Sequence, residues 1–430
     1  MELYGFQKQS IAELEEPDKH IVVQPVGSGK TAVMFNWLKN QGRPKVLIIT
    51  TASKRDSGDM QTEADMWCGE EWRASLSSFV VLSWAGLAKW WQQNRYVFEP
   101  AEWAIALDEV QSGKAGVSSQ RGKAFLQIAA QTDCWTGYTA TAGDKWIDFY
   151  AYFTATHKVR NKTEFTRKFC NVQTFKGFPE IVSYIHTDVL EDWWNDISVR
   201  PDASVMYKEI PPETHKVVTL SKPREYQEVI KTRMYNGKML DTTMGLCMTL
   251  RQICFTKEKK QWIADFLEGL GTNAVFFHNF IEEGEEIERI AKKVLPKGAK
   301  VWLINGKTHE IPTKETIGKH DIIVANYGAG AEGLNLQFVN YWVSVDYNYS
   351  YTKSTQARGR IRRIGQKRPQ FYYYLETKGT IEQDIKRCLS SKRDFSEITW
   401  TAQLEEKEED LFWRKNENLE VERKEGQNEN

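Results

Sequence analysis

Short apolar runs recur along the chain, and stretches with helical spacing of apolar positions separate them. In the first third of the chain, such runs lie at 20–24, 46–50, 80–83, 103–107 and 134–140. A continuous apolar run of this length is typical of a strand that is buried on both faces. Because helical stretches lie between the runs, we expect a mostly parallel sheet covered by helices.

The same rhythm returns in the second half of the chain. Five further runs lie at 274–278, 301–304, 321–325, 341–346 and 370–376. They predict a second α/β lobe. The two halves share this rhythm and no recognisable sequence repeat, so we expect two separate lobes with their own cores.

The connection between the lobes has a different pattern. Aromatic and charged residues are mixed from about residue 148 onward, and Pro201, Pro211 and Pro212 mark the end of this stretch. We expect a helical insertion followed by a linker. The last thirty residues are rich in Glu, Lys and Asn, which predicts a frayed helix or a disordered tail. The predicted domains are 1–150, 151–212, 213–400 and 401–430.

Length and charge narrow the classes of protein that fit. A chain of 430 residues exceeds what one hydrophobic core usually supports, and 41% hydrophobic residues argue against global disorder. The formal net charge is zero, so no overall field draws the protein onto nucleic acid. Any nucleic-acid surface must therefore be local.

The cysteines and the N-terminus favour a reducing compartment. The six cysteines form no C-x-x-C pair and no Cys/His cluster with zinc-ligand spacing. The first nine residues do not combine a basic region with an apolar stretch, and no apolar run approaches membrane-spanning length. We expect a protein of the cytoplasm, of a bacterium or a phage-infected host, with no membrane partner and as a monomer.

Residues 24–31 read Gln-Pro-Val-Gly-Ser-Gly-Lys-Thr between the first apolar run and a helical stretch at 32–38. Small residues let successive backbone N–H groups converge on phosphate oxygens at a helix N-terminus. Lys30 would reach the β- and γ-phosphates, and the Thr31 hydroxyl would bind Mg²⁺. Gln24 stands where many phosphate loops have glycine, and the alternative is a simple Gly-Ser turn. The predicted nucleotide-binding residues of this loop are Gly27, Ser28, Gly29, Lys30 and Thr31.

Asp108 and Glu109 follow the apolar run at 103–107. Acidic residues at the carboxyl end of a parallel strand point toward the ligand crevice of the sheet. We expect Asp108 to hold Mg²⁺ and Glu109 to polarise the attacking water. The alternative is that these carboxylates cap a helix.

Residues 356–366 read Gln-Ala-Arg-Gly-Arg-Ile-Arg-Arg-Ile-Gly-Gln. Arg360 and Arg363 are three residues apart, so on a helix they point the same way. The plain alternative is a solvated basic face. The spacing closely resembles motif VI of the Snf2-like branch of superfamily 2 helicases. That resemblance implies catalytic roles for Gln356, Arg360 and Arg363, with the two arginines facing the γ-phosphate.

Other segments resemble motifs of the same superfamily. Residues 108–111 resemble motif II, with Gln111 in place of the frequent histidine, and 139–141 resemble motif III. Residues 4–7 resemble the segment in which a glutamine, here Gln7, recognises adenine. Further matches lie at 50–54 (motif Ia), 83–84 (motif Ib), 250–254, 276–280 (motif IV), 328–336 (motif V) and 347–348.

These resemblances imply further site residues. Gly333 in motif V would lie at the ATP site. The implied nucleic-acid contacts are Thr51, Ser53, Lys54, Ser83, Trp84, Gly328 and Gly330.

The resemblance spans roughly residues 3–384 and implies two RecA-like lobes that hydrolyse ATP with Mg²⁺ while moving on double-stranded DNA. The second hypothesis is a strand-separating helicase that acts on DNA or RNA, including single-stranded substrates. The motor subunit of a restriction or repair system is another, which would bring replication, recombination or repair partners. A protein of a different class, a nucleotide-gated clamp or scaffold without productive ATP turnover, is a further alternative. We expect DNA binding that is salt-sensitive and largely independent of sequence, because phosphate contacts dominate such binding.

Overall fold

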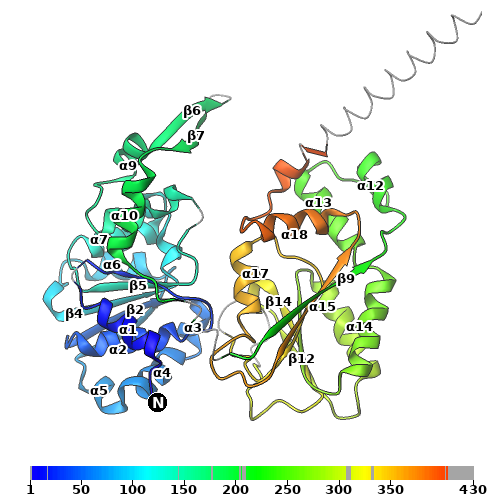
Figure 1. The fold of residues 1–430 in the computed structure, drawn as a ribbon, viewed down its shortest axis with the longest axis horizontal. Helices are drawn as coiled ribbons and strands as arrows, with labels where there is room; N and C mark the ends of the chain where they lie inside the picture. The colour runs from blue at the N-terminus through cyan, green and yellow to red at the C-terminus, as the bar shows by residue number, and fades with distance from the viewer. Residues whose placement is uncertain are drawn as a thin grey trace, which may run out of the picture. The chain divides into compact units, whose positions relative to one another are not determined.

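The structure, a computed structural model, divides into two compact units (Figure 1). It describes residues 2–16, 18–143, 145–175, 178–202, 205, 210–306, 311–330, 334–401 and 403–404, and the account below refers to these. The first unit contains the described residues up to Glu213 together with Gly330–Asn340 and Thr355–Gln370. The second unit contains the other described residues.

The first unit is built on a six-stranded parallel sheet. Its strand order is β3-β2-β4-β5-β1-β8, and neighbouring strands pair in parallel. The strands are β1 (Ile21–Val23), β2 (Lys45–Thr50), β3 (Ser78–Ser83), β4 (Trp103–Asp108), β5 (Trp135–Thr139) and β8 (Ser198–Val199).

Apolar residues on both faces of this sheet are buried, as continuous apolar strands require. Along β2, Val46 and Ile48 face one helical layer, and Leu47 and Ile49 face the other. The first layer contains α1 (Gly5–Glu13), α2 (Lys30–Asn40) and α4 (Asp59–Cys68). The second contains α6 (Leu87–Asn94), α7 (Gln120–Ala129), α8 (Tyr150–Ala155) and α10 (Thr187–Ile197).

Shorter elements complete the first unit. These are α3 (Ala52–Asp56), α5 (Glu70–Ser75), α9 (Lys162–Phe169) and the 3-10 turns Pro100–Glu102, Val110–Gly113, Gly116–Ser118 and Trp146–Phe149. An antiparallel hairpin of β6 (Cys170–Phe175) and β7 (Phe178–Tyr184) follows α9 and extends beyond it, away from the sheet (Figure 1). The predicted insertion is therefore partly helical, and it also supplies this hairpin and strand β8.

The second unit has a sheet with the order β13-β14-β12-β15-β16-β9. Strands β12 to β16 pair in parallel. The six strands of this sheet are β9 (Glu213–Leu220), β12 (Ala274–His278), β13 (Val301–Ile304), β14 (Ile322–Asn326), β15 (Tyr341–Ser344) and β16 (Gln370–Thr377).

Two long helices, α14 (Lys257–Leu270) and α15 (Ile281–Val294), pack on one face of this sheet. A separate apolar cluster joins α12 (Tyr226–Thr232), α13 (Thr243–Ile253) and α18 (Ile381–Ser390). The remaining elements are α16 (Tyr327–Gly330), α17 (Tyr351–Arg358) and the small hairpin of β10 (Met234–Tyr235) and β11 (Lys238–Met239).

The predicted fold class is confirmed: two mostly parallel sheets are covered by helices, and each of the ten predicted strands is present with small shifts at its ends. The predicted domain boundaries stay a prediction. The six cysteines are free thiols, and four of them are buried. Among the described residues, no helix is long and apolar enough to cross a membrane. The predicted tail lies almost entirely outside the described residues.

Candidate ATP site

A tight loop connects β1 to α2, and two glycines make it possible. Gly27 and Gly29 have φ angles of +81° and +76°, a region that glycine enters without strain. A Cβ at Gly29 would lie 2.5 Å from Nε2 of Gln7, and one at Gly27 would lie 2.6 Å from the Arg362 carbonyl oxygen. Both positions therefore require glycine for conformation and for space, and α2 begins immediately afterwards with its N–H groups at the loop.

Helix α1 holds this loop from one side. The Gln7 side-chain amide donates to the Ser28 carbonyl oxygen at 2.9 Å, and its Oε1 accepts from the Tyr4 N–H at 3.0 Å. Gln24 donates to the Ser10 hydroxyl at 2.9 Å and accepts from the Ser28 hydroxyl at 3.3 Å. The residue that departs from the usual phosphate-loop pattern therefore anchors the loop to α1.

Lys30 lies at the first position of α2 and folds back over the loop. Its ammonium donates to the carbonyl oxygens of Gln24 and Pro25, at 3.1 and 3.2 Å. Burial lowers the pKa of Lys30 to about 8, although the nearby carboxylates of Glu109 and Asp108 oppose that shift. A phosphate group at the loop would raise the pKa of Lys30 again and so favour its charged form.

Asp108 ends β4 and is buried beside the loop. One carboxylate oxygen accepts from the Thr50 hydroxyl and from the Lys54 ammonium, both at 2.7 Å. Burial alone would raise the pKa of Asp108, but Lys54 and the Thr50 hydrogen bond outweigh it and hold the pKa below the ordinary value. Asp108 is therefore ionised at neutral pH.

Glu109 follows with a left-handed backbone, at a φ of +51°. A non-glycine residue rarely adopts this conformation, and such strain is often found at functional sites. The Gln111 side-chain amide donates to one Glu109 oxygen at 2.7 Å. The turn therefore redirects the chain, and Gln111 fixes the orientation of the carboxylate.

The predicted arginines lie against the same loop, within the first unit. Arg360 and Arg363 each donate to the Leu334 carbonyl oxygen, at 3.3 and 3.1 Å, and Arg363 also donates to the Asn335 side chain. The Ile364 N–H donates to the Gly27 carbonyl oxygen at 3.3 Å. Burial lowers the pKa of Arg363, against the opposing effect of Glu63 and Glu109.

These groups surround a cavity of about 60 Å³. Four cationic side chains and two carboxylates line it, so the wall carries two more positive than negative charges. The lining residues are Val26, Gly27, Gly29, Lys30, Thr31, Thr51, Lys54, Asp108, Glu109, Arg360 and Arg363.

Comparison with known proteins gives one family model, "Helicase conserved C-terminal domain", over residues 258–365. The "Uncharacterized ATP-dependent helicase YqhH" of Bacillus subtilis is 39% identical over 75 residues, which is 17% of this chain and 13% of that protein. The "SNF2 domain-containing protein CLASSY 4" of Arabidopsis thaliana is 26% identical over 172 residues, which is 37% of this chain and 15% of that protein. Residues 258–365 thus match a helicase family, and the named relatives support the resemblance to Snf2-like helicases of superfamily 2.

The chain matches only about one seventh of the length of these two relatives. Among solved structures, it is similar to the "Sulfolobus solfataricus SWI2/SNF2 ATPase core in complex with dsDNA", with a TM-score of 0.41 and 17% identity. That similarity covers 90% of this chain and 89% of the solved chain.

Several residues that the Snf2-like motifs imply as nucleic-acid contacts have partners inside the protein. The Trp84 indole is buried and donates to the Asp108 carbonyl oxygen at 2.8 Å. The Ser83 hydroxyl accepts from Arg55 at 3.1 Å, and Lys54 bonds to Asp108 as described above. In this structure they brace the carboxyl ends of β3 and β4, and their contact with nucleic acid stays a prediction.

The other predicted residues are spread more widely. Thr51 lines the cavity, whereas Gln356 is buried on α17 outside the set of lining residues. Gly328 is exposed, with its N–H donating to the Asn326 side chain at 2.8 Å, and Gly330 is buried. Gly333 and the Ser53 side chain lie outside the described part of the structure. The roles of all these residues stay predictions.

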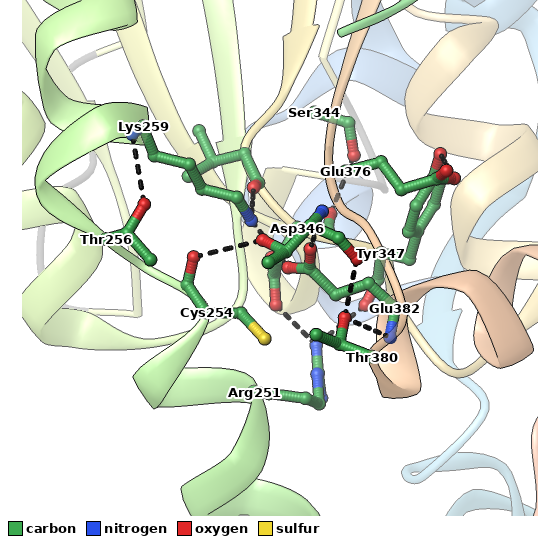
Figure 2. A network of polar contacts seen from close by, with 12 residues as sticks. Arg251, Cys254, Thr256, Lys259, Ser344, Asp346, Tyr347, Glu376, Thr380 and Glu382 are labelled. Carbon is green, nitrogen blue, oxygen red and sulfur yellow. Dashed lines mark hydrogen bonds and ion pairs between the residues drawn. The ribbon is translucent and has the colours of Figure 1, made fainter. Parts of the chain in front are cut away.

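The second unit contains a buried polar network that the motifs did not reveal (Figure 2). Arg251 of α13 donates to Asp346 at 2.6 Å and to the Tyr347 carbonyl oxygen at 2.7 Å. Lys259 of α14 donates to Glu382 of α18 at 2.5 Å and to the Val345 carbonyl oxygen at 2.8 Å.

Charge in this network is balanced. Burial opposes the charged form of Arg251, but Asp346 holds its pKa above the ordinary value. Burial likewise opposes the charge on Lys259, but the neighbouring Glu382 raises the pKa of this lysine. The sequence indicates the segments around Arg251 and Tyr347 separately, but nothing in the local pattern predicts that Arg251 pairs with a residue almost a hundred positions away.

Proposed function

We propose that this protein is a nucleic-acid-stimulated ATPase that moves on double-stranded DNA. The observation that supports it most is the cavity at the β1–α2 loop, where four cations meet two carboxylates. Such an excess of positive charge beside a glycine loop and a helix N-terminus suits a polyphosphate. The similarity to Snf2-like helicases supports the class of motor.

Each residue of the cavity has a role in this proposal. Lys30 neutralises charge on the β- and γ-phosphates as it develops in the transition state. Glu109 orients and polarises the attacking water, and Gln111 holds its carboxylate in place. Arg360 and Arg363 stabilise negative charge on the transferred phosphoryl group, because guanidinium forks match phosphate oxygens.

The oxygen donors of Thr31 and Asp108 fit Mg²⁺, which prefers such ligands and keeps several waters. When bound, the ion supplies charge neutralisation to the phosphates. Within the described residues, no group of three or more His, Cys, Asp or Glu side chains could hold a metal ion alone. In the structure Lys54 neutralises Asp108, so Lys54 has to share or release that carboxylate when the ion binds.

The DNA part of the proposal rests on the family. The resemblance to the Snf2-like branch implies movement along duplex DNA, often without separation of its strands. A strand-separating helicase is therefore the second candidate for this chain. A nucleotide-gated clamp without turnover is the third, and the presence of Lys30, Glu109 and both arginines around one cavity argues against it.

Two measurements test the proposal. Phosphate release from ATP should rise several-fold when duplex DNA is added. If DNA does not stimulate ATP turnover, the nucleotide-gated clamp is the remaining candidate function. Displacement of a triplex-forming strand, without unwinding of a forked duplex, identifies a translocase, and the reverse result identifies a helicase.

A further inference from the structure

The hairpin of β6 and β7 and the helix α9 before it form an exposed surface that the ATP site does not use. We define the ribbon surface as residues 158–174 and 179–184. The two strands form a sheet of their own, and Asn171, Gln173 and Thr174 are exposed. Isolated two-stranded ribbons are marginally stable in water, and their open edges invite association. An element of this kind therefore suggests a binding partner.

The charge of the ribbon surface indicates the partner. It contains five lysines and arginines against two glutamates, whereas the whole chain has a net charge of zero. Lys158 pairs with Asp196 at 2.9 Å and Lys168 with Glu164 at 2.7 Å. Among the described residues, the other three cations make no ion pair, and all three are exposed: Arg160, Lys162 and Arg167.

The ribbon adds amide side chains that form hydrogen bonds without charge. Asn171 and Gln173 are two residues apart on β6 and lie opposite Ser183 and Glu180 of β7, with a register shift between Asn171 and Val172, so the amides share this ribbon with one carboxylate. Asn171 donates to the hydroxyl of Ser183 across the hairpin at 2.9 Å. Amide side chains of this type bind base edges and sugar-phosphate oxygens.

We propose that the ribbon surface is a second contact with duplex DNA, in which the ribbon enters a groove and the cations of α9 bind the flanking phosphates. The major groove of B-DNA admits a two-stranded β-ribbon. Helix α9 leads directly into β6, so Arg167 lies three residues before the ribbon begins. This inference rests on the proposed function, since it assumes that the motor acts on duplex DNA.

The first test changes charge at the foot of the ribbon. A triple variant carries Arg160→Gln, Lys162→Gln and Arg167→Gln. The matched control carries Lys89→Gln, Arg121→Gln and Lys123→Gln, which removes three exposed cations from α6 and α7 of the same unit. Affinity for a labelled duplex of mixed sequence is measured by fluorescence anisotropy over a range of salt concentrations.

Each lost phosphate contact should lower the salt slope by about 0.9, so the ribbon variant should lose about 2 to 3 in slope. Its affinity at low salt should fall at least tenfold, and the control should change little. Equal losses in both variants, or no loss in the ribbon variant, would overturn the inference. Turnover without DNA and the unfolding temperature should not change in either variant, because the substituted side chains are exposed.

The second test asks what the ribbon touches. A photo-crosslinking residue replaces Gln173, and the control replaces Gln92, which is exposed on α6. With duplex and ATP present, the first should give a DNA adduct and the second should not. If the residue at 173 crosslinks to another protein chain and not to DNA, the ribbon is a protein-docking edge and the inference fails.

The two proposals fail in different ways. If duplex DNA does not stimulate phosphate release by the unmodified protein, the proposed function fails. If it stimulates release and the ribbon variant matches its control, the motor stands and the ribbon surface does not contact DNA.

Discussion

Two charged clusters lie in this protein, each near the carboxyl ends of parallel strands, and they differ in charge balance. At the first sheet, four cations face two carboxylates around a cavity. At the second sheet, Arg251 and Lys259 are matched one to one by Asp346 and Glu382 and are buried (Figure 2). The first cluster has an excess of positive charge for a ligand, whereas in the second each cation has a carboxylate partner. The same chemical groups can therefore build a binding site or a structural joint, and the balance of charge decides which.

The surroundings of the two clusters reinforce this difference. Lys30 bonds to carbonyl oxygens of its own loop, and its pKa is lowered to about 8. Lys259 bonds to a carboxylate, and its pKa is raised. An ammonium with a lowered pKa gains from an incoming anion, and one with a raised pKa already has its anion. Substitutions should consequently affect activity at the first cluster and stability at the second.

The largest expected effect is that of Lys30→Ala, which should reduce phosphate release to background, a loss of more than about a thousandfold. The reason is loss of the charge that neutralises the developing phosphate anion. Because burial already disfavours the ammonium, the unfolding temperature should stay the same or rise. Lys39→Ala, on the same helix, serves as the control. Near-normal turnover in the folded Lys30→Ala variant would contradict the assignment of residues 24–31 as a phosphate-binding loop.

Arg360→Ala and Arg363→Ala should each lower turnover about a thousandfold, the usual size of arginine contributions to phosphoryl transfer. ATP binding, measured by calorimetry, should weaken much less. Replacement by lysine should restore little activity, because a point charge does not reproduce the guanidinium fork. If lysine restores most of the rate, charge alone matters and the proposed geometry is wrong.

At the second cluster, Lys259→Met should destabilise the protein by about 3–5 kcal/mol, because it leaves Glu382 buried without its cation. Adding Glu382→Gln should recover much of that loss, since the amide still accepts from the Thr377 N–H, which lies 2.7 Å from the carboxylate. Urea unfolding of the single and double variants measures both values. A double variant less stable than Lys259→Met would contradict the role of charge pairing.

The smallest expected effect concerns pH. Below about pH 8 the free protein already carries the charge on Lys30, and above it a proton must be taken up when phosphate binds. Nucleotide affinity should therefore be constant between pH 7 and 8 and fall by up to about tenfold per unit above pH 8. Calorimetry in buffers of different ionisation enthalpy should detect the proton uptake. The same pH dependence in Lys30→Met would show that another group titrates.

Comparison of the two clusters also shows how far the sequence can be interpreted. Lys30, Asp108 and Glu109 were found because short motifs place them directly after apolar strands. The role of Gln24 as an anchor, the burial of Trp84 and the joining of β8 to the first sheet depend on contacts far apart in the chain. The pairing of Arg251 with Asp346 is of the same kind. Periodicity predicts which faces are buried, but it does not say which buried charges meet.

The most direct test of the central claim is phosphate release by the unmodified protein and by Arg363→Ala at saturating ATP, as the concentration of duplex DNA is raised. We expect the rate of the unmodified protein to rise to a plateau, and the plateau of Arg363→Ala to be about a thousandfold lower. If Arg363→Ala reaches the same plateau at higher DNA concentration, this arginine binds DNA and the cavity is not the complete hydrolytic site.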